Sequence, residues 1–379
     1  LSQEELTFET ADRLIRFDQE QGAIASIQLK TYKEDQLSDL PVELLDSHMV
    51  MQGTADISRR SGKVGFRARR EGQTLTFSKQ EGVWEITQTF TVPESGYGLD
   101  VSVNYRNTSA ESQELTAGFL VQENISKPSG GGGFFTPHSV NDVSFIYGID
   151  GSREEIILKA YCEEEEKKSA ISLSTEKLDY LGLDKHYFMV LLWASQQPAN
   201  YLVDRSAPGT ELLCPMATMI SHRFGQVPPG ASEQLQLTGY YGPKKVETLE
   251  AFNPALKSSI KLGWFSLVAH PLLTALKGVH SFVGNWGIAI VLVTLVLKMF
   301  FYPLTRAAAI SAKKMQKLQP EMNQLKEKYK GDPQRQQREV MAFMSKHKVN
   351  PLKGCLPMLP QIPVFIAFYN VLSQAIELR

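Results

Sequence analysis

Apolar and polar residues alternate along most of the first 250 residues, with the period of two that is typical of β-strands. Five stretches follow the pattern clearly: "RLIRFD", "AIASIQLK", "GLDVSVNYRN", "HYFMVLLWA" and "EQLQLTGYYG". Clusters of turn-forming residues such as "PESGYG" and "DGSREE" separate the alternating stretches. Because no helix-period stretch stands out before about residue 245, the pattern predicts an all-β sandwich over residues 1–250.

The pattern becomes helical after residue 250. Apolar residues recur at nearly helical spacing from Leu262 to Val279, with Trp264 near the start and Pro271 inside the stretch. We expect residues 260–279 to form an amphipathic helix in the membrane interface. A membrane span followed by a tight reversal within "HSFVGNW" is the alternative.

Two apolar stretches are long enough to cross a bilayer. Residues 281–302 make about 33 Å of helix, which matches a hydrocarbon core of about 30 Å, and Pro303 is expected to end this helix. Residues 355–376 contain no charged residue. Their prolines lie near the start of the stretch, where the first amides of a helix have no hydrogen-bond partner within the helix anyway. The sequence therefore predicts transmembrane helices at 281–302 and 355–376.

Residues 306–350, between the two predicted spans, are polar and helical in pattern. Apolar residues on the first half are spaced like a heptad seam, and they are Met315, Leu318, Met322, Leu325 and Tyr329. The turn-forming "KGDPQ" interrupts the pattern, and a second helix follows. These features predict an antiparallel helical hairpin.

Charge is distributed unevenly, although 40 Lys and Arg nearly balance 41 Asp and Glu in the whole chain. Twelve basic and four acidic residues lie between Pro303 and Gly354. Short basic loops stay in the cytoplasm, so the β domain, one span away, is expected in the bacterial periplasm. Five basic residues of the hairpin are candidates for contacts with ribosomal RNA or anionic lipid, and they are Lys313, Lys314, Lys317, Arg335 and Arg338. A topology signal with solvated charges is the alternative.

Lys298 is a charged residue inside the otherwise apolar first span. Charged residues at such positions typically face a wet cavity or a partner. The alternative is that the Lys298 side chain snorkels to the headgroups, because Pro303 lies only about 7 Å further along the helix. Thr294, Gln361 and Asn370 are polar residues of the spans that either hydrate a groove around Lys298 or only mediate helix packing.

The cysteines and the chain ends indicate compartment and completeness. Cys162 and Cys214 are able to pair if the β domain is periplasmic, and ordinary buried thiols are the alternative. The sequence begins at Leu1 without methionine and stops in "VLSQAIELR", so we expect it to be a fragment of a longer protein.

Four motifs occur in a fixed order in the C-terminal hundred residues: "NWG" at 285–287, "YPLT" at 302–305, "LQP" at 318–320 and "NPLKGCLPMLPQIP" at 350–363. Together they make this region similar to the YidC/Oxa1/Alb3 membrane protein insertases. The β domain resembles the large periplasmic domain of the Gram-negative YidC type, a β-supersandwich related to sugar-mutarotase folds. The resemblance implies an N-terminal anchor and a core of five spans, of which this sequence holds two.

The resemblance also implies a function and a site. Family members carry a positive residue, usually arginine, in a hydrophilic groove on the first core span, and Lys298 matches that position. Lysine keeps the charge but lacks the bidentate fork of arginine. The implied function is insertion and folding of short one- or two-span membrane proteins, alone or with the Sec translocon. No cofactor is implied, and the sequence contains no GxxxxGK[ST] nucleotide motif.

Three other functions remain open from the residues alone. An accessory translocon subunit would use the β domain mainly for docking. A channel or transporter would use Lys298 as a selectivity charge and would show repeated spans, which are not visible here. A glycan-active periplasmic enzyme would need a general acid and base, for which the candidates are His48, His138, His186 and His222. Because nothing in the sequence places these histidines together, we do not expect an enzyme.

Overall fold

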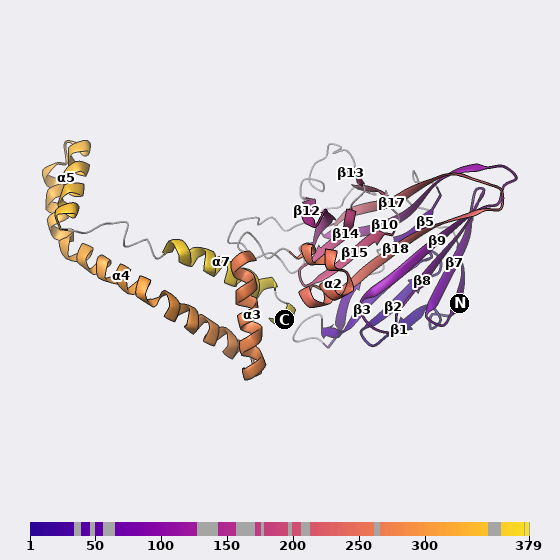
Figure 1. The fold of residues 1–379 in the computed structure, drawn as a ribbon, viewed down its shortest axis with the longest axis horizontal. Helices are drawn as coiled ribbons and strands as arrows, with labels where there is room; N and C mark the ends of the chain where they lie inside the picture. Colours follow the sequence, from indigo (N-terminus) through magenta and orange to yellow (C-terminus); the bar gives the residue numbers. More distant parts are fainter. Residues whose placement is uncertain are drawn as a thin grey trace. The chain divides into compact units, whose positions relative to one another are not determined.

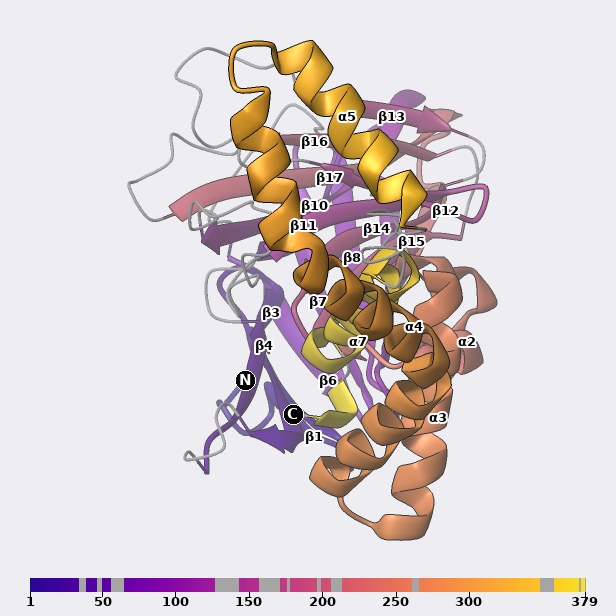
Figure 2. The ribbon, with the colours of Figure 1, turned by 90° about the vertical axis from the view of Figure 1, so that its left-hand side faces the viewer.

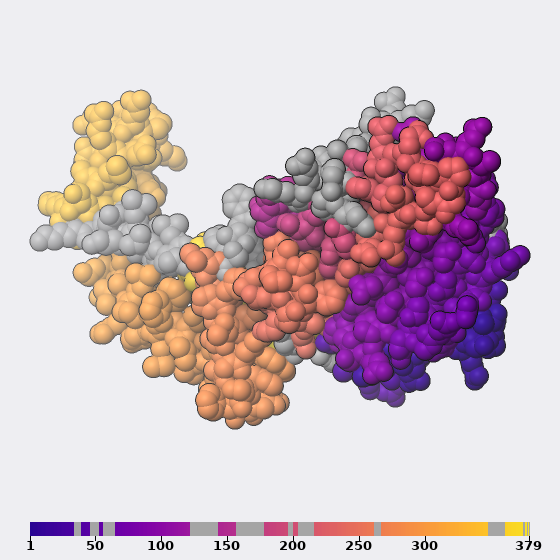
Figure 3. All heavy atoms as spheres, turned by 45° about the vertical axis from the view of Figure 1, so that its right-hand side comes forward, coloured from indigo at the N-terminus to yellow at the C-terminus, as the bar shows by residue number. Residues whose placement is uncertain are grey.

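The computed structural model describes residues 1–33, 39–45, 50–55, 65–126, 143–156, 171–175, 178–195, 199–205, 213–260, 266–347, 358–374 and 376–378. The chain divides into two compact units, Leu1–Ile260 and Lys261–Arg379, which are described separately. In Figure 3 the first unit runs from indigo to salmon and the second from orange to yellow. The first unit is built from β-sheets and the second from helices, as the sequence predicts.

The described strands of the first unit form three antiparallel sheets (Figure 1). A four-stranded sheet has the order β1 (Thr7–Glu9), β2 (Arg13–Asp18), β3 (Ala23–Lys33), β4 (Pro41–Leu45). A five-stranded sheet has the order β13 (Ile171–Thr175), β16 (Ala199–Arg205), β17 (Leu213–Val227), β10 (Gln113–Ser126), β5 (Val50–Thr54). A nine-stranded sheet has the order β12 (Ser152–Ile156), β11 (Val143–Ile149), β14 (Leu178–Lys185), β15 (Phe188–Ala194), β18 (Ser232–Pro243), β9 (Gly98–Asn107), β8 (Trp84–Thr91), β7 (Thr74–Glu81), β6 (Arg67–Glu71).

Aromatic side chains join the four-stranded sheet to the nine-stranded sheet. The ring of Phe17 on β2 lies 5.0 Å from that of Phe90 on β8 and 6.1 Å from that of Phe77 on β7. All three side chains are buried, and along β8 buried residues alternate with partly exposed ones. The alternation in the sequence therefore marks which face of each strand enters the sandwich.

Gln88 on β8 is a fully buried polar residue that links all three sheets. Its Oε1 accepts a hydrogen bond from the amide of Gly53 on β5 at 2.8 Å, and its Nε2 donates to the carbonyl of Gly22 between β2 and β3. Gly22 has φ +59°, and a Cβ there would meet the ring of Phe66 at 2.7 Å, so the turn requires glycine. The satisfied amide of Gln88 thus fixes the mutual position of the sheets.

The β unit ends with two short helices, α2 (Val246–Phe252) and η1 (Pro254–Ser259). Leu249 and Leu256 of these helices are fully buried, in a cluster that includes Tyr180, Leu191 and Tyr240 of the nine-stranded sheet. Because these leucines belong to the β core, the unit extends to Ile260. The predicted domain end at residue 250 was therefore ten residues early.

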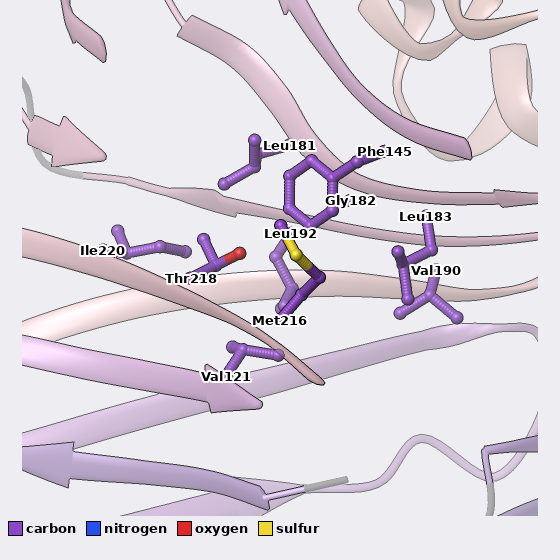
Figure 4. A pocket seen from close by; sticks show the side chains of 10 residues that line it. All are labelled: Val121, Phe145, Leu181, Gly182, Leu183, Val190, Leu192, Met216, Thr218 and Ile220. Carbon is purple, nitrogen blue, oxygen red and sulfur yellow. The ribbon is translucent and has the colours of Figure 1, made fainter. Parts of the chain in front are cut away.

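A small apolar cavity lies between the nine-stranded and five-stranded sheets (Figure 4). Its volume is about 30 Å³, and Phe145, Leu192 and Met216 are among its lining residues. A space of this size accommodates no more than a water-sized group, and its apolar walls offer few hydrogen bonds. We assign it to imperfect packing between the two sheets.

The second unit contains α3 (Ser266–Val283), α4 (Trp286–Lys328), α5 (Pro333–Lys346), α7 (Met358–Gln374) and η2 (Ile376–Leu378). Gly284, with φ +67°, ends α3 and donates its amide to the carbonyl of His280 at 2.7 Å. The side chain of Asn285 then caps α4 by accepting from the amide of Ile288 at 3.1 Å. The helix predicted at 260–279 thus extends to Val283, and the helix predicted at 281–302 begins only at Trp286.

Helix α4 continues through Pro303 and Pro320 to Lys328, so the prediction that Pro303 ends this helix was wrong. An internal proline removes one i→i−4 hydrogen bond and bends the helix, and membrane helices often accommodate this loss. The 43 residues of α4 reach roughly 65 Å, well beyond the thickness of a bilayer core. One helix therefore carries both the apolar segment and the first arm of the basic hairpin.

Among the described residues, α4 is the one helix that is long and apolar enough to cross a membrane. The apolar part of α3, Leu267–Val283, and that of α7, Gln361–Ser373, are shorter. The predicted second span at 355–376 corresponds to α7, and residues 351–357 lie outside the described part. The assignment of α7 as a membrane span stays a prediction.

Helix α5 returns along the end of α4, which forms the hairpin that the sequence predicts (Figures 1 and 2). Asp332 caps α5 by accepting from the amide of Arg335 at 3.1 Å. The five seam residues of α4, Met315, Leu318, Met322, Leu325 and Tyr329, are half-buried, whereas the lysines between them are exposed. The heptad spacing therefore identifies the side of α4 that is shielded from solvent.

Candidate functional site

A cavity of about 340 Å³ lies between α4 and α7 in the helical unit. Its lining combines one cation and several hydroxyl and amide groups with aromatic and aliphatic side chains. The lining residues are Thr294, Leu297, Lys298, Phe301, Tyr302, Thr305, Gln361, Val364, Phe365 and Phe368. A space of this size and mixed character is typical of a site that binds a ligand or a peptide segment.

The polar residues that α4 contributes lie on one stripe of the helix. Thr294, Lys298, Tyr302 and Thr305 follow one another at intervals of four, four and three residues, which places them on the same face. The Thr294 hydroxyl donates to the carbonyl of Ile290 at 2.6 Å, and the Thr305 hydroxyl donates to the carbonyl of Phe301 at 3.0 Å. Since both protons are used within the helix, the hydroxyl oxygens keep their lone pairs for acceptor roles.

Helix α7 provides the opposite wall with Gln361, Val364, Phe365 and Phe368. These residues are three, one and three positions apart and so share one face of the helix. Gln361 supplies an amide that both donates and accepts hydrogen bonds. The side chain of Phe365 is 56% exposed, whereas Phe368 is 9% exposed. The α7 wall is therefore mainly apolar, with a single amide near the start of the helix.

Lys298 provides the positive charge of the cavity. Within the described ranges, no carboxylate lies at ion-pair distance from its ammonium group. Its side chain is exposed in the isolated chain. The cavity thus offers a cation without an ion-pair partner between two apolar helices. This arrangement favours binding of an anionic or strongly polar ligand or peptide segment.

Three of the four residues predicted for the groove therefore meet in one cavity: Lys298, Thr294 and Gln361. Asn370 does not line it. Asn370 is nine residues from Gln361, which corresponds to about half a turn around the helix, so the two side chains leave α7 on opposite sides. Sequence reasoning missed Tyr302 and Thr305, although following the three-to-four spacing from Lys298 identifies both.

The basic residues predicted to make partner contacts are exposed on the hairpin. Lys313, Lys314 and Lys317 lie on α4, and Arg335 and Arg338 lie on α5. The guanidinium group of Arg335 lies 5.3 Å from the centre of the Tyr329 ring, within cation–π range. The other four basic side chains form a solvated positive surface on the two arms of the hairpin.

Of the four histidines that are candidates for an enzyme in the β unit, the structure describes His186 and His222. His186 packs edge-on against Tyr187, and His222 packs against Phe224. His48 and His138 lie outside the described residues, as do Cys162 and Cys355. Across the described ranges, no group of three His, Cys, Asp or Glu side chains is arranged to hold a metal ion. The proposed pairing of Cys162 with Cys214 thus falls outside the described part.

Two family models together match almost the whole chain. Residues 5–275 match the YidC periplasmic domain, and residues 278–379 match the 60Kd inner membrane protein family. The border between the matches falls within α3, close to the division between the two units. The chain thus joins a β domain of the YidC periplasmic type to a helical part of the 60Kd inner membrane protein type.

Similar proteins carry one common name. The membrane protein insertase YidC of Pelobacter propionicus is 32% identical over 397 residues, which cover 100% of this chain and 69% of that protein. The insertase of Syntrophobacter fumaroxidans is 32% identical over 82% of this chain and 54% of its own length. That of Geobacter metallireducens is 48% identical over 40% of this chain and 28% of its own length. The chain belongs to the YidC membrane protein insertase family.

Solved structures show a much weaker likeness. A galactose mutarotase-like protein from Lactobacillus casei has a TM-score of 0.40 and 12% identity, with 62% of this chain and 99% of that chain covered. A putative aldose 1-epimerase from Escherichia coli has a TM-score of 0.40 and 10% identity, with 62% and 97% covered. At these TM-scores the likeness carries no argument about this chain. The relatives of this chain are named as insertases, and family membership therefore rests on them and not on the solved structures.

Proposed function

We propose that this chain inserts newly made membrane proteins through the cavity between α4 and α7, which we call the groove. The observation that carries the proposal is the position of Lys298. An ammonium group without an ion-pair partner in the described residues lies in a 340 Å³ space whose other walls are largely apolar. A charge in such a segment is costly by about 3 kcal/mol on insertion scales, so its presence in the groove indicates a use in function.

The mixed lining explains how the groove acts on a short substrate. Polar groups from Lys298, Gln361 and the threonine oxygens allow water to enter the inner leaflet and shorten the apolar barrier. The positive charge holds acidic groups of the translocated end while they cross. Phe301, Phe365 and Phe368 offer an apolar wall along which the hydrophobic part of the substrate slides into lipid.

The energy for insertion comes from the substrate itself. Transfer of apolar surface out of water contributes about 25 cal/mol per Å², and a single span buries enough surface to make the overall step favourable. The groove lowers the barrier for the polar end and requires no nucleotide. Substrates with one or two spans and short, acidic translocated segments suit this mechanism.

The membrane topology that we propose follows from the charges and from α4. The basic hairpin lies in the cytoplasm, the β unit lies in the periplasm, and the apolar part of α4 connects them as one span of a multi-pass protein. Helix α3 lies at the periplasmic surface of the membrane, in the interface between lipid and water. The 88% and 92% exposure of the apolar Leu267 and Phe282 supports this placement. Helix α7 is the second span.

We further propose that the protein works alone on simple substrates and beside the Sec translocon on larger ones.

On the cytoplasmic side, the solvated positive surface of the hairpin suits phosphate groups of ribosomal RNA or anionic lipids. The five residues involved are Lys313, Lys314, Lys317, Arg335 and Arg338. Contacts of this kind weaken steeply as salt is added.

An insertion assay tests the central role of Lys298. The full-length protein is reconstituted in liposomes, and a two-span substrate with an acidic translocated loop is scored by protease protection. Lys298→Ala is expected to abolish protection, while Lys298→Arg restores it because a positive potential suffices. Lys326→Ala, an exposed lysine on the same helix but outside the groove and outside the five contact residues, serves as the matched control and should insert normally.

The outcomes separate the proposed mechanism from its competitors. Equal protection by wild type, Lys298→Arg and Lys298→Ala would show that the lysine only snorkels. Rescue by arginine beyond the wild-type level would show that the groove grips carboxylates bidentately. Failure of all folded variants, including wild type, would favour an accessory role beside a translocon.

A further inference from the structure

Tyr302 carries the one groove hydroxyl whose proton is unused within the described part of the chain. The groove contains three hydroxyl groups, those of Thr294, Tyr302 and Thr305. Both threonines donate their protons to carbonyls of α4 itself, one turn back, and so offer only acceptor oxygens. The phenol of Tyr302, 63% exposed in the isolated chain, forms no hydrogen bond to a described residue. Its O–H group therefore remains available to a ligand.

The helices around the groove contain no carboxylate that could accept from this hydroxyl. The sequence has no Asp or Glu from residue 251 to residue 320, or from residue 340 to residue 376. These ranges include α3, α7 and the whole apolar part of α4. The ammonium group of Lys298 thus has no acidic neighbour on these helices, and the next cation, Arg306, does not line the groove. A carboxylate that reaches Lys298 and Tyr302 has to come from outside these helices.

The side chains of Lys298 and Tyr302 lie one helical turn apart on the same stripe of α4. Residues four positions apart on a helix have Cβ atoms about 5–6 Å apart. Long side chains of a helix lean toward its N-terminus, which directs the Tyr302 ring back over the turn that carries Lys298. Because the lysine has a flexible four-carbon stem, its ammonium group reaches the same level. Both donors are therefore within reach of one small anionic group.

Two donors of this kind suit a carboxylate better than an ammonium group alone does. An ammonium is a compact point charge, whereas the fork of arginine donates two parallel hydrogen bonds to the two oxygens of a carboxylate. Lys298 lacks that fork, and Tyr302 supplies a second donor from the neighbouring turn. The pair thus offers one positive charge and two separate donors, as a single arginine would.

We propose that Tyr302 is a specificity-determining residue of the groove, and that its hydroxyl binds the substrate carboxylate that Lys298 attracts. The proposal rests on the proposed insertion function and defines its substrate class more narrowly. A positive potential alone attracts any anion, but a hydrogen bond from Tyr302 adds a preference for the carboxylates of Asp and Glu. A neutral amide gains less, because hydrogen bonds to charged acceptors are roughly twice as strong as those between neutral groups.

A binding experiment tests this role with the full-length protein in nanodiscs of zwitterionic lipid. The probes are two fluorescently labelled peptides of Leu and Ala that differ only in one Glu or Gln near the end. Binding to empty nanodiscs is subtracted, and the ratio of the two dissociation constants measures the preference for the carboxylate. Tyr302→Phe keeps the ring and removes the hydroxyl, so it should lower this preference about fivefold. Tyr369→Phe, which changes an exposed tyrosine of α7 outside the groove, is the matched control and should bind like wild type.

A second background separates a shared carboxylate from other roles of the ring. In Lys298→Arg the guanidinium group supplies both donors, so adding Tyr302→Phe should lower the preference less than about twofold. The same loss in both backgrounds would show that Tyr302 acts independently of Lys298, and this result overturns the proposal. Equal weakening of the Glu and Gln peptides, which indicates packing of the ring only, overturns it as well, and so does an unchanged ratio. Circular dichroism confirms that each variant is folded.

An insertion assay keeps this result distinct from the proposed function. Tyr302→Phe should insert the acidic two-span substrate about threefold to tenfold more slowly than wild type. A substrate whose translocated acids are changed to Asn and Gln should insert at equal rates in both proteins. If wild type inserts but Tyr302→Phe keeps the full preference for Glu, insertion stands and the role of Tyr302 is wrong. If wild type binds the Glu peptide through Tyr302 but inserts nothing, the carboxylate site stands and the proposed insertion function is wrong.

Discussion

The ammonium group of Lys244 lies 2.7 and 2.8 Å from the two carboxylate oxygens of Asp184, and both side chains are buried. Lys244 follows directly after β18, at the start of the segment that carries α2 and η1. Arg153 binds the same carboxylate at 2.8 Å and also donates to the carbonyl of Ser259, at the end of η1. The Asp184 carboxylate on β14 thus stabilises both ends of the segment 244–259, which contains α2 and η1. It binds Lys244 at the start directly, and it holds Ser259 at the end through Arg153.

Replacing Asp184 with Asn should destabilise the β unit by about 3–5 kcal/mol, because the buried charges of Lys244 and Arg153 lose their counter-charge. Denaturant unfolding of the full-length protein, followed by near-UV circular dichroism, measures the change. Asp100→Asn is the matched control on the exposed outer face and should shift stability by less than about 1 kcal/mol. Hydrogen exchange in η1 should rise in Asp184→Asn, and an unchanged exchange rate there would contradict the fastening role.

Lys244 should also make stability depend on pH. Burial lowers the pKa of Lys244 below its ordinary value of 10.5, against the opposing effect of Asp184. Between the lowered pKa and 10.5 the unfolded chain binds more protons than the folded chain, so this group makes stability rise with pH in that window. The stability of wild type relative to Lys244→Met should therefore increase as pH approaches 10.5. A flat difference between the two proteins would show that burial does not affect the lysine.

Arg13 on β2 is an internal cation with few partners. Its side chain is fully buried, and Nη2 donates to the carbonyl of Gly98 at 2.7 Å. Nε and Nη1 have no hydrogen-bond partner within the described residues, and burial lowers the pKa of the guanidinium group to about 10. Arg13→Met, which keeps apolar volume and removes the charge, should stabilise the β unit by about 1–2 kcal/mol.

The same unfolding experiment checks Arg13, with Arg13→Ala as the comparison. Alanine also removes the charge but leaves a cavity, so it should be clearly less stable than the methionine variant. If Arg13→Met is instead destabilised by several kcal/mol, the Nε and Nη1 donors of Arg13 must form hydrogen bonds in solution, for example to buried water. The two substitutions together separate the cost of the charge from the cost of lost packing.

The joint between α3 and α4 is held by Asn285 and by a stacked pair of rings. The side chain of His280 lies parallel to Trp286, with centroids 3.8 Å apart and an interplanar angle of 8°. Asn285→Ala should lose the cap on Ile288 and cost about 1 kcal/mol, with fraying of the first turn of α4. Trp286 fluorescence, compared between wild type and His280→Leu, reports the loss of the stack. Asn323→Ala, within the exposed surface of α4, serves as the control without a cap.

The sequence predicts those features that depend on local periodicity. Alternation identifies the buried face of β9, which carries Val101 and Val103, and the heptad spacing identifies the shielded face of α4 through Leu318 and Leu325. The predictions fail where a distant contact decides. Leu249 and Leu256 join the β core because the nine-stranded sheet offers them an apolar surface, which no local pattern reveals. Helix α4 passes through Pro303 because one lost hydrogen bond is small beside the remaining bonds of a long helix.

The groove was also predictable in part. Lys298 and Thr294 share a face of α4 by spacing alone, but the choice of Gln361 over Asn370 depends on which side of α7 meets α4. Because nine residues separate them, a single rotation of α7 cannot place both side chains in the groove. The spacing excludes one of the two, and the structure selects Gln361.

This difference between Gln361 and Asn370 gives a direct test of the groove. Gln361→Leu keeps the side-chain volume but removes the amide, so the groove should hold less water and insert the acidic two-span substrate about threefold to tenfold more slowly. Asn370→Leu makes the equivalent change on the opposite side of α7 and should leave the rate unchanged. Protease protection over time in liposomes measures both rates. A slower rate in Asn370→Leu alone would place the polar path on the other face of α7, whereas equal slowing in both variants would indicate that α7 packing, rather than hydration of the groove, controls insertion.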